Sequence, residues 1–209
     1  MISFPGVATP KTSQSHPLII NHVQIPETGG KVGLTFCPGK KGTSIYSGTW
    51  DRDLALDLAA VCEFGAKALI TLMEEHEFEG IGLSISELQE RANACGLEWH
   101  HLPIRDVSTP DERFEDLWTY SGLRLRKMLA NGGNIVIHCH GGLGRTGLLA
   151  ARLLVEFGET AEAAISKVRQ ARPGSIETAA QERHVNRCRP IAWARVAKSW
   201  QERSLACLL

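Results

Sequence analysis

The chain has 209 residues, of which 43% are hydrophobic and 22% are charged, proportions typical of a globular protein with a substantial core. Its 23 Lys and Arg residues balance its 23 Asp and Glu residues, so no overall field attracts it to nucleic acid or to an anionic membrane. No apolar run approaches the length of a membrane span, and residues 1–11 lack the pattern of a secretory signal. We therefore expect a cytoplasmic protein without a nucleic-acid or membrane partner.

The six cysteines are scattered along the chain, with neither CxxC pairs nor the spacing of a zinc site. This pattern favours reduced thiols, and we expect no metal and no cofactor.

Residues 1–17 are rich in Ser, Thr, Pro and Gly, which predicts a flexible N-terminal lead-in before a single domain over residues 18–209. Apolar, β-branched runs predict strands at 18–25, 32–36, 68–73, 97–102 and 134–139. Apolar periodicity predicts helices at about 53–64, 84–95, 111–130, 145–157, 161–171, 178–188 and 191–204. Strands that alternate with helices predict an α/β fold with a central, mostly parallel sheet of four to five strands, flanked by helices, and a helical C-terminal layer.

Capping residues mark several of these boundaries. Asp51 or Asp53 can cap the first helix, and residues 84–87, Ser-Ile-Ser-Glu, form a capping box before the second. Gly65 and Gly96 follow these two helices, as glycine commonly does where a helix ends.

The most informative segment is residues 135–147, Ile-Val-Ile-His-Cys-His-Gly-Gly-Leu-Gly-Arg-Thr-Gly. A predicted strand ends in Cys139, a glycine-rich turn follows, and Arg145 opens a helix rich in Ala and Leu. The free N–H groups and the dipole of a helix N-terminus bind anions, and a guanidinium can hold two phosphate oxygens at once. The same field favours the ionised thiolate of Cys139, an activated nucleophile toward a bound phosphorus.

Other interpretations of this segment are weaker. An inert core cysteine needs neither three following glycines nor an arginine. His138, Cys139 and His140 are adjacent, so their side chains diverge, and no other ligand pair has suitable spacing for a metal. A nucleotide-binding P-loop would end in Gly-Lys-Ser/Thr, which this segment does not.

The pattern His138-Cys139-x5-Arg145-Thr146 resembles the signature of the cysteine-dependent protein tyrosine and dual-specificity phosphatases. The resemblance implies that Cys139 attacks phosphorus to form a phosphocysteine and that Arg145 holds the transferring phosphoryl group. It further implies that the Thr146 hydroxyl stabilises the departing thiolate. The main-chain N–H groups that would bind phosphate are those of His140, Gly141, Gly142, Leu143, Gly144 and Arg145.

The family takes its catalytic proton from an aspartate on a loop upstream of the cysteine. Asp106 fits this position, and Asp111 is the alternative, although it also fits the start of a helix. Residues 176–181, Ile-Glu-Thr-Ala-Ala-Gln, resemble the Gln-Thr-x-x-Gln segment of tyrosine phosphatases, with Glu177 in place of the first glutamine. Gln181 is therefore the candidate for positioning the hydrolytic water, and the role of Glu177 stays open.

Further segments are similar to the cyclin-dependent kinase inhibitor 3-like group of kinase-associated dual-specificity phosphatases, namely residues 34–40, 50–54, 65–66 with 70–72, 101–104 and 141–145. The resemblance covers about residues 30–190. It implies hydrolysis of phosphotyrosine, and of phosphoserine or phosphothreonine where pocket depth allows, in a phosphorylated protein partner such as a kinase. Whether Cys37 or Cys62 protects Cys139 by a disulfide under oxidation stays open.

Two alternative functions also stay open. A phosphoinositide or inositol-phosphate phosphatase could use the same loop, but positions 140–144 carry no lysine for additional phosphates, and Arg105 is the candidate extra cation. A module that binds phosphoproteins or a kinase with little turnover would not need the intact set of Cys139, Arg145 and Asp106.

Overall fold

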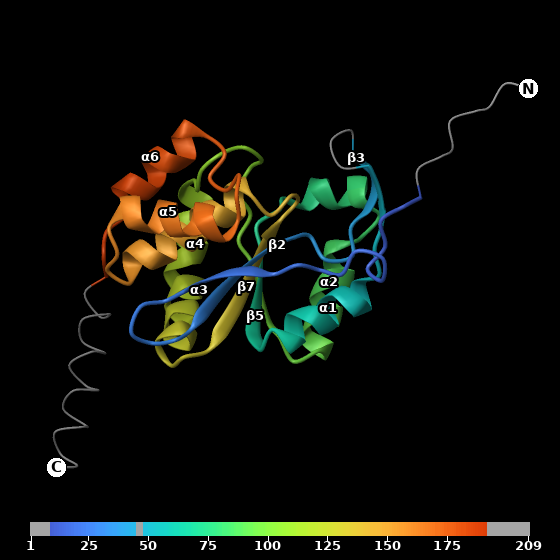
Figure 1. Ribbon diagram of the computed structural model, residues 1–209, viewed down its shortest axis with the longest axis horizontal. Coiled ribbons are helices and arrows are strands. Elements are labelled where there is room, and N and C mark those ends of the chain that lie inside the picture. Colours follow the sequence, from blue (N-terminus) through green and yellow to red (C-terminus); the bar gives the residue numbers. More distant parts are fainter. Residues whose placement is uncertain (1–8, 45–47, 192–209) are drawn as a thin grey trace, which may run out of the picture.

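The structure is a computed structural model that describes residues 9–44 and 48–191. Its centre is a five-stranded sheet with the order β1-β2-β7-β5-β6 (Figure 1). β1 is antiparallel to β2 and the other neighbouring strands are parallel, which confirms the predicted mostly parallel sheet. The strands are Asn21–Gln24 (β1), Lys31–Phe36 (β2), Ala66–Thr71 (β5), Glu98–His101 (β6) and Asn134–Cys139 (β7).

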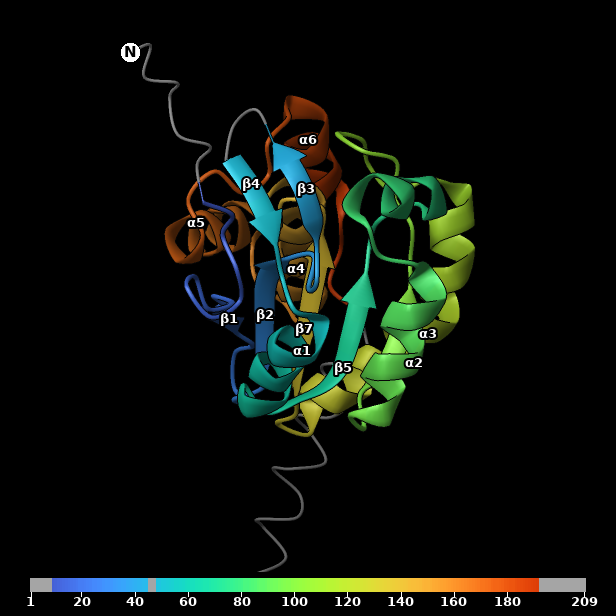
Figure 2. The ribbon, with the colours of Figure 1, turned by 90° about the vertical axis from the view of Figure 1, so that its right-hand side faces the viewer.

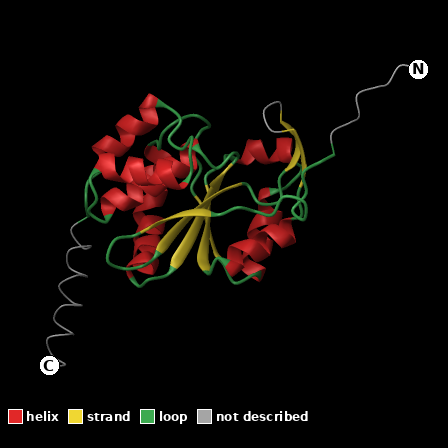
Figure 3. Cartoon of the chain, viewed as in Figure 1, coloured by secondary structure: helices red, strands yellow, loops and turns green. Residues whose placement is uncertain are grey.

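Helices cover both faces of the sheet (Figures 1 and 3). One face carries α1 (Leu54–Glu63) and α2 (Ile85–Ala94), which contact β5 and β6 respectively. The other face carries α3 (Glu112–Ala130), α4 (Gly144–Glu156), α5 (Ala161–Ala171) and α6 (Ala179–Arg187). Every residue of α4 is buried, because this helix packs against β2 and β7 as well as against α5 and α6. The predicted helix at 191–204 lies, apart from its first residue, outside the described residues.

Three elements were not predicted. β3 (Lys41–Ser44) and β4 (Gly48–Asp51) form an antiparallel pair apart from the main sheet (Figure 2). Such short strands carry no clear alternation of apolar and polar residues. The segment 37–42, Cys-Pro-Gly-Lys-Lys-Gly, predicts only a turn, whereas its last two residues begin β3. The 3-10 helix η1 (Glu75–Ile81) buries only Phe78 and Ile81, which gives too few apolar positions for a period.

Part of the expected N-terminal lead-in is held against this β3–β4 pair. Lys11 exchanges main-chain hydrogen bonds with Thr49 and Asp51, at 2.9 and 3.1 Å. The buried Arg52 guanidinium donates to the His16 carbonyl oxygen at 2.8 Å. The described residues of the lead-in are therefore tied to the domain by the backbone of β4 and by the Arg52 side chain, while residues 1–8 lie outside the described part.

The parallel strands bring four loops to one edge of the sheet. β7 ends at Cys139, and the loops after β2, β5 and β6 carry Lys40, Glu77 and Asp106. Ligands of α/β sheets generally bind at the carboxyl ends of parallel strands, so this edge is where a site is expected. No helix in the described ranges is both long and apolar enough to cross a membrane.

Candidate active site

The loop of residues 140–143 joins the end of β7 to the start of α4 and surrounds the Cys139 thiol. Cys139 is 3% exposed, and the Gly142 N–H donates to its Sγ at 3.2 Å. Within the described residues, no protein atom accepts a hydrogen bond from the main-chain N–H groups of residues 140, 141 and 143–145. Unpaired N–H groups at the start of a buried helix form a site for an anion.

Two glycines let this loop pack closely. Gly142 has a φ of +73°, and a Cβ there would collide with the backbone of Thr35 and Phe36 at the end of β2. A Cβ on Gly144 would collide with the Glu177 carboxylate and lie about 3.0 Å from the Gln181 amide. The glycines therefore allow β2 and the segment before α6 to close around the Cys139 loop.

Arg145 is buried at the first turn of α4, with 2% of its surface exposed. Its guanidinium donates to both carboxylate oxygens of Glu77, at 2.5 and 2.8 Å, and to the Ile104 carbonyl at 3.1 Å. Its Nη2 also lies 2.8 Å from Oδ1 of Asp106. Burial alone would lower the pKa of Arg145, but Glu77 and the other nearby anionic groups raise it above its usual value. Arg145 thus stays charged while its plane is fixed.

Glu77 was not predicted as a site residue. It lies in η1, where Glu74, Glu75 and Glu79 are near it in sequence, and no spacing distinguishes one of the four carboxylates. Burial alone would raise the pKa of Glu77, but its hydrogen bonds with Arg145 hold the pKa below its usual value. The structure thus adds a carboxylate that orients Arg145.

Asp106 and Asp111, the two candidate acids, have different surroundings. Asp106 is 67% exposed in the loop after β6 and its carboxylate reaches Arg145. Asp111 is the N-cap of α3, where its Oδ1 accepts from the Phe114 N–H at 2.9 Å. The structure therefore brings Asp106 to the Cys139 loop and gives Asp111 a capping role.

His138 and Thr146 flank the loop from inside the core. His138 Nε2 shares a 2.8 Å hydrogen bond with the Thr71 hydroxyl, and burial lowers the pKa of His138 to about 3. The histidine is therefore neutral at physiological pH. The Thr146 Oγ1 is buried without a hydrogen-bond partner among the described residues.

Gln181 is buried and its amide joins two loops at the site. Its Oε1 accepts from the Glu177 N–H at 2.9 Å, and its Nε2 donates to the Ser108 carbonyl at 3.1 Å. Gln181 therefore links the Asp106 loop to the segment before α6. The exposed Glu177 carboxylate lies against Gly144.

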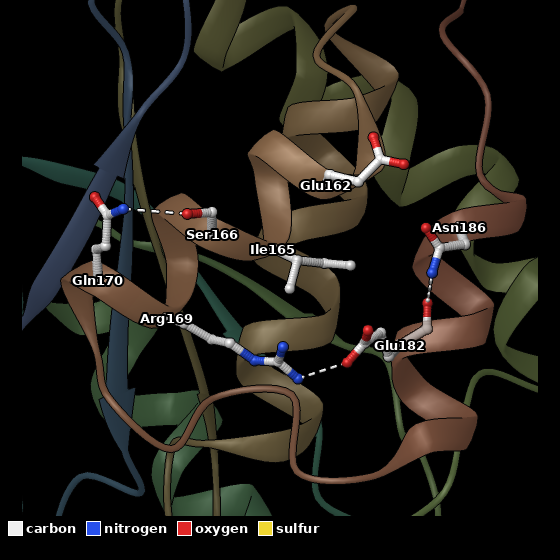
Figure 4. Close-up of a pocket in the computed structure, with 7 residues that line it drawn as sticks. All are labelled: Glu162, Ile165, Ser166, Arg169, Gln170, Glu182 and Asn186. Atoms are coloured by element: carbon white, nitrogen blue, oxygen red, sulfur yellow. Dashed lines mark hydrogen bonds and ion pairs between the residues drawn. The ribbon is translucent and has the colours of Figure 1, made fainter.

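The segment before α6 is also anchored from its other side, where a surface hollow of about 630 Å³ opens between α5 and α6 (Figure 4). Arg169, on the wall of this hollow, pairs with Glu182 at 2.7 Å. The same guanidinium donates to the carbonyls of Ser175 and Ile176, at 3.2 and 3.1 Å. This hollow is separate from Cys139, and its arginine serves to hold the chain that carries Glu177 and Gln181.

Two further cations at the Cys139 loop were not predicted. Arg172, just after α5, donates to the Gly142 carbonyl at 2.6 Å and to the Gly141 carbonyl at 3.3 Å. Lys40, in the turn after β2, is 7% exposed. Neither lies near the loop in sequence, so no local motif points to them.

The other cysteines have distinct positions. Cys37 is fully buried at the end of β2, and its N–H donates to the His140 carbonyl at 3.4 Å. Burial raises the pKa of the Cys37 thiol. Cys62, on α1, has the Cys95 carbonyl as its hydrogen-bond partner, at 3.7 Å. No group of three His, Cys, Asp or Glu residues in the described ranges is arranged to hold a metal ion.

Known proteins are similar to this chain in sequence and in fold. A family model described as "Polymorphic toxin system, DSP-PTPase phosphatase" matches residues 46–159, more than half of the chain. Human cyclin-dependent kinase inhibitor 3 is 36% identical over 50% of this chain and 50% of its own length. The mouse protein of that name is 36% identical over 76% of this chain and 71% of its own. A crystal structure of kinase-associated phosphatase, with its catalytic cysteine replaced by serine, matches with a TM-score of 0.69 at 26% identity, covering 81% of this chain and 92% of that one.

The fold and the Cys139 loop are those of the tyrosine-phosphatase class of proteins. The chain belongs to the dual-specificity phosphatase (DSP-PTPase) family, which confirms the resemblance found in the sequence. The match to the first human and rat relatives spans about half of their length, 50% and 44% respectively.

Proposed function

We propose that this chain hydrolyses phosphotyrosine, and also phosphoserine and phosphothreonine, in proteins through a phosphocysteine intermediate. The observation that carries the proposal is the Cys139 loop, in which a buried thiol and unpaired main-chain N–H groups lie at the start of the helix that carries the buried Arg145 guanidinium. Phosphoryl transfer needs mainly positioning and charge stabilisation, and these groups supply both.

In the first step the Cys139 thiolate attacks phosphorus, and the bond between phosphorus and the leaving oxygen breaks. Arg145 and the loop N–H groups stabilise the charge on the phosphoryl oxygens. Asp106, in its acid form, gives its proton to the leaving oxygen. Its exposed side chain supports this role, because it can turn from Arg145 toward a substrate.

In the second step water attacks the phosphocysteine and loses a proton to the Asp106 carboxylate, while the S–P bond breaks and inorganic phosphate leaves. The buried, unpaired Thr146 hydroxyl is suited to donate a hydrogen bond to the departing thiolate. Gln181, which adjoins the loop, is the candidate to orient the water. Its amide already bonds to Glu177 and Ser108, so this role requires an exchange of partners.

A phosphorylated protein, with a kinase among the candidates, is the proposed partner. This assignment is supported by the similarity to cyclin-dependent kinase inhibitor 3 and to kinase-associated phosphatase. Inositol phosphates are a second candidate substrate class, because Lys40 and Arg172 add positive charge near the loop.

The test is turnover of p-nitrophenyl phosphate by the intact chain and by Cys139→Ser, with Cys95→Ser as the matched control because Cys95 is exposed. We expect Cys139→Ser to lose at least about 10³-fold in kcat, since a hydroxyl is a far weaker nucleophile at neutral pH. Cys95→Ser should behave as the unmodified chain does. Comparable turnover by all three proteins would refute the mechanism, and a faster reaction with a soluble inositol phosphate than with phosphopeptides would reassign the substrate.

A further inference from the structure

Lys40 lies in the turn that leaves β2 directly beside the Cys139 loop. Phe36, the last residue of β2, is the register partner of Cys139. The next residue, Cys37, donates its N–H to the His140 carbonyl, and Gly142 packs on the backbone of Thr35 and Phe36. The turn and the Cys139 loop therefore both pack against the end of β2.

The Lys40 side chain lies over two aromatic rings, those of Phe36 and Trp50. Its Nζ lies 4.8 Å from the centre of the Phe36 ring and 4.6 Å from that of Trp50. Lys40 is 7% exposed, and no described residue accepts a hydrogen bond from its ammonium group or forms an ion pair with it. Lysines this deeply buried are normally paired, because an ammonium ion loses most of its hydration there.

No carboxylate in the described residues forms an ion pair with the Lys40 ammonium. Burial lowers the pKa of Lys40, and its electrostatic neighbours are the Cys37 and Cys139 thiols and the Arg52 and Arg172 guanidinium groups. The Asp57 carboxylate, which also acts on Cys37, is already bound by Arg52 through two hydrogen bonds of 2.7 and 2.8 Å. The buried ammonium thus lacks a counter-ion on the side of the Cys139 loop.

We propose that Lys40 forms a second anion subsite, which binds an acidic or phosphorylated side chain next to the scissile phosphate of a phosphopeptide. The assignment rests on the proposed phosphatase function and specifies its substrate. An anion at this position would supply the missing partner of a desolvated ammonium, a charge-assisted hydrogen bond of the stronger kind. The Phe36 and Trp50 rings, whose centres are 5.4 Å apart, hold the Lys40 ammonium in its position.

A polyphosphorylated ring fits this subsite less well than a peptide does. Glu77, Asp106 and Glu177 place three carboxylates around the loop, against Arg145 and Gly144. These groups repel a ligand that carries phosphates in all directions. A peptide can direct one extra negative charge toward Lys40 and leave the other sides of the loop neutral.

The experiment uses phosphotyrosine peptides that are identical except for Glu or Gln at one position within three residues of the phosphotyrosine. The measured quantity is the ratio of kcat/KM for the Glu peptide to that for the Gln peptide, at each position. We expect a ratio of about ten at one position or more in the unmodified chain, the size of one charge-assisted hydrogen bond. Lys40→Met should bring that ratio to about one, and Lys40→Arg should retain most of it.

The matched control is Lys41→Met, because Lys41 is the next residue, is exposed and pairs with Asp51 at 3.7 Å. It should keep the ratio of the unmodified chain. A ratio near one at every position in the unmodified chain would overturn the subsite while leaving the phosphatase proposal intact, whatever the stability of Lys40→Met. The same peptide pairs, bound to Cys139→Ser, give an affinity ratio that tests the subsite even without turnover, whereas loss of turnover on every phosphorylated substrate would refute the proposed function. Stronger inhibition by an inositol polyphosphate than by the Glu peptide would overturn the peptide assignment.

Discussion

Arg172 and Gly142 are joined by a 2.6 Å hydrogen bond from the guanidinium Nε to the carbonyl oxygen. The same guanidinium reaches the Gly141 carbonyl at 3.3 Å and the Asn21 side chain at 2.8 Å. Arg172 therefore ties the loop carbonyls to β1 and to the end of α5. The C=O and N–H bonds of one trans peptide group point in opposite directions. Because Arg172 holds these carbonyls away from Cys139, the N–H groups of the same peptides point toward the anion site.

Replacing Arg172 by Met should weaken phosphate binding without removing any reacting group. We expect kcat/KM for p-nitrophenyl phosphate to fall by about 10- to 100-fold and vanadate affinity to fall in parallel, because the N–H groups lose their alignment. Arg172→Lys should recover only part of the loss, since lysine lacks the forked donors of a guanidinium. Arg183→Met, at an exposed position of α6, is the control. Unchanged vanadate affinity in Arg172→Met would show that the loop keeps its shape without this contact.

Substitutions of the two aspartates upstream of the loop should have different effects: those of Asp106 on kcat, and those of Asp111 on the free energy of unfolding. Asp106→Asn should lower kcat by roughly 10²- to 10⁴-fold, the usual cost of a lost general acid. Asp111→Asn should keep activity and stability, because Asn is as good an N-cap as Asp, whereas Asp111→Ala should cost about 1 kcal/mol of unfolding free energy. Steady-state kinetics and urea unfolding measure the two effects. If Asp111→Asn is the slow variant instead, the acid has been assigned to the wrong residue.

The sequence predicts the parts of this site that are contiguous in the chain. The Cys139 loop lies between a buried strand and a buried helix, and both have strong local patterns, so residues 134–157 are placed correctly. The position of the loop that carries Asp106 follows from the predicted strand before it. Lys40 and Glu77 follow β2 and β5, which reach β7 only through the sheet order β2-β7-β5. Arg172 follows α5, which packs against α4 and β1. Residues that only the folded structure brings together have no characteristic spacing in the sequence, so they could not be predicted from it.

Glu77→Gln should lower activity through the orientation of Arg145. The carboxylate binds Arg145 with two hydrogen bonds, and the amide can accept only through one oxygen, so we expect kcat/KM to fall by about tenfold. The Glu77 pKa is below its usual value of 4.5 in the folded chain. Its charged form therefore stabilises the fold above about pH 4.5, and this stabilisation is lost as the pH falls through the folded-state pKa.

The corresponding measurement is the unfolding free energy of the unmodified chain and of Glu77→Gln at pH 7, 5 and 3.5. The difference between the two proteins should be the same at pH 7 and pH 5 and should shrink at pH 3.5. A difference that stays constant to pH 3.5 would contradict the ion pair as its source.

Glu156, at the end of α4, should matter for stability and not for catalysis. It is 4% exposed and accepts hydrogen bonds from Trp118, Arg126 and Arg152, at 3.0, 2.8 and 2.9 Å. Glu156→Leu would leave two buried guanidinium groups without this carboxylate, and we expect a loss of about 3–5 kcal/mol in urea unfolding. The control, Glu87→Leu, breaks an exposed pair with Arg91 on α2 and should cost less than about 1 kcal/mol. Because Glu156 lies about 16 Å along the helix from Arg145, the folded Glu156→Leu protein should keep the KM of the unmodified chain. A raised KM at unchanged stability would mean that this buried network acts on the Cys139 loop.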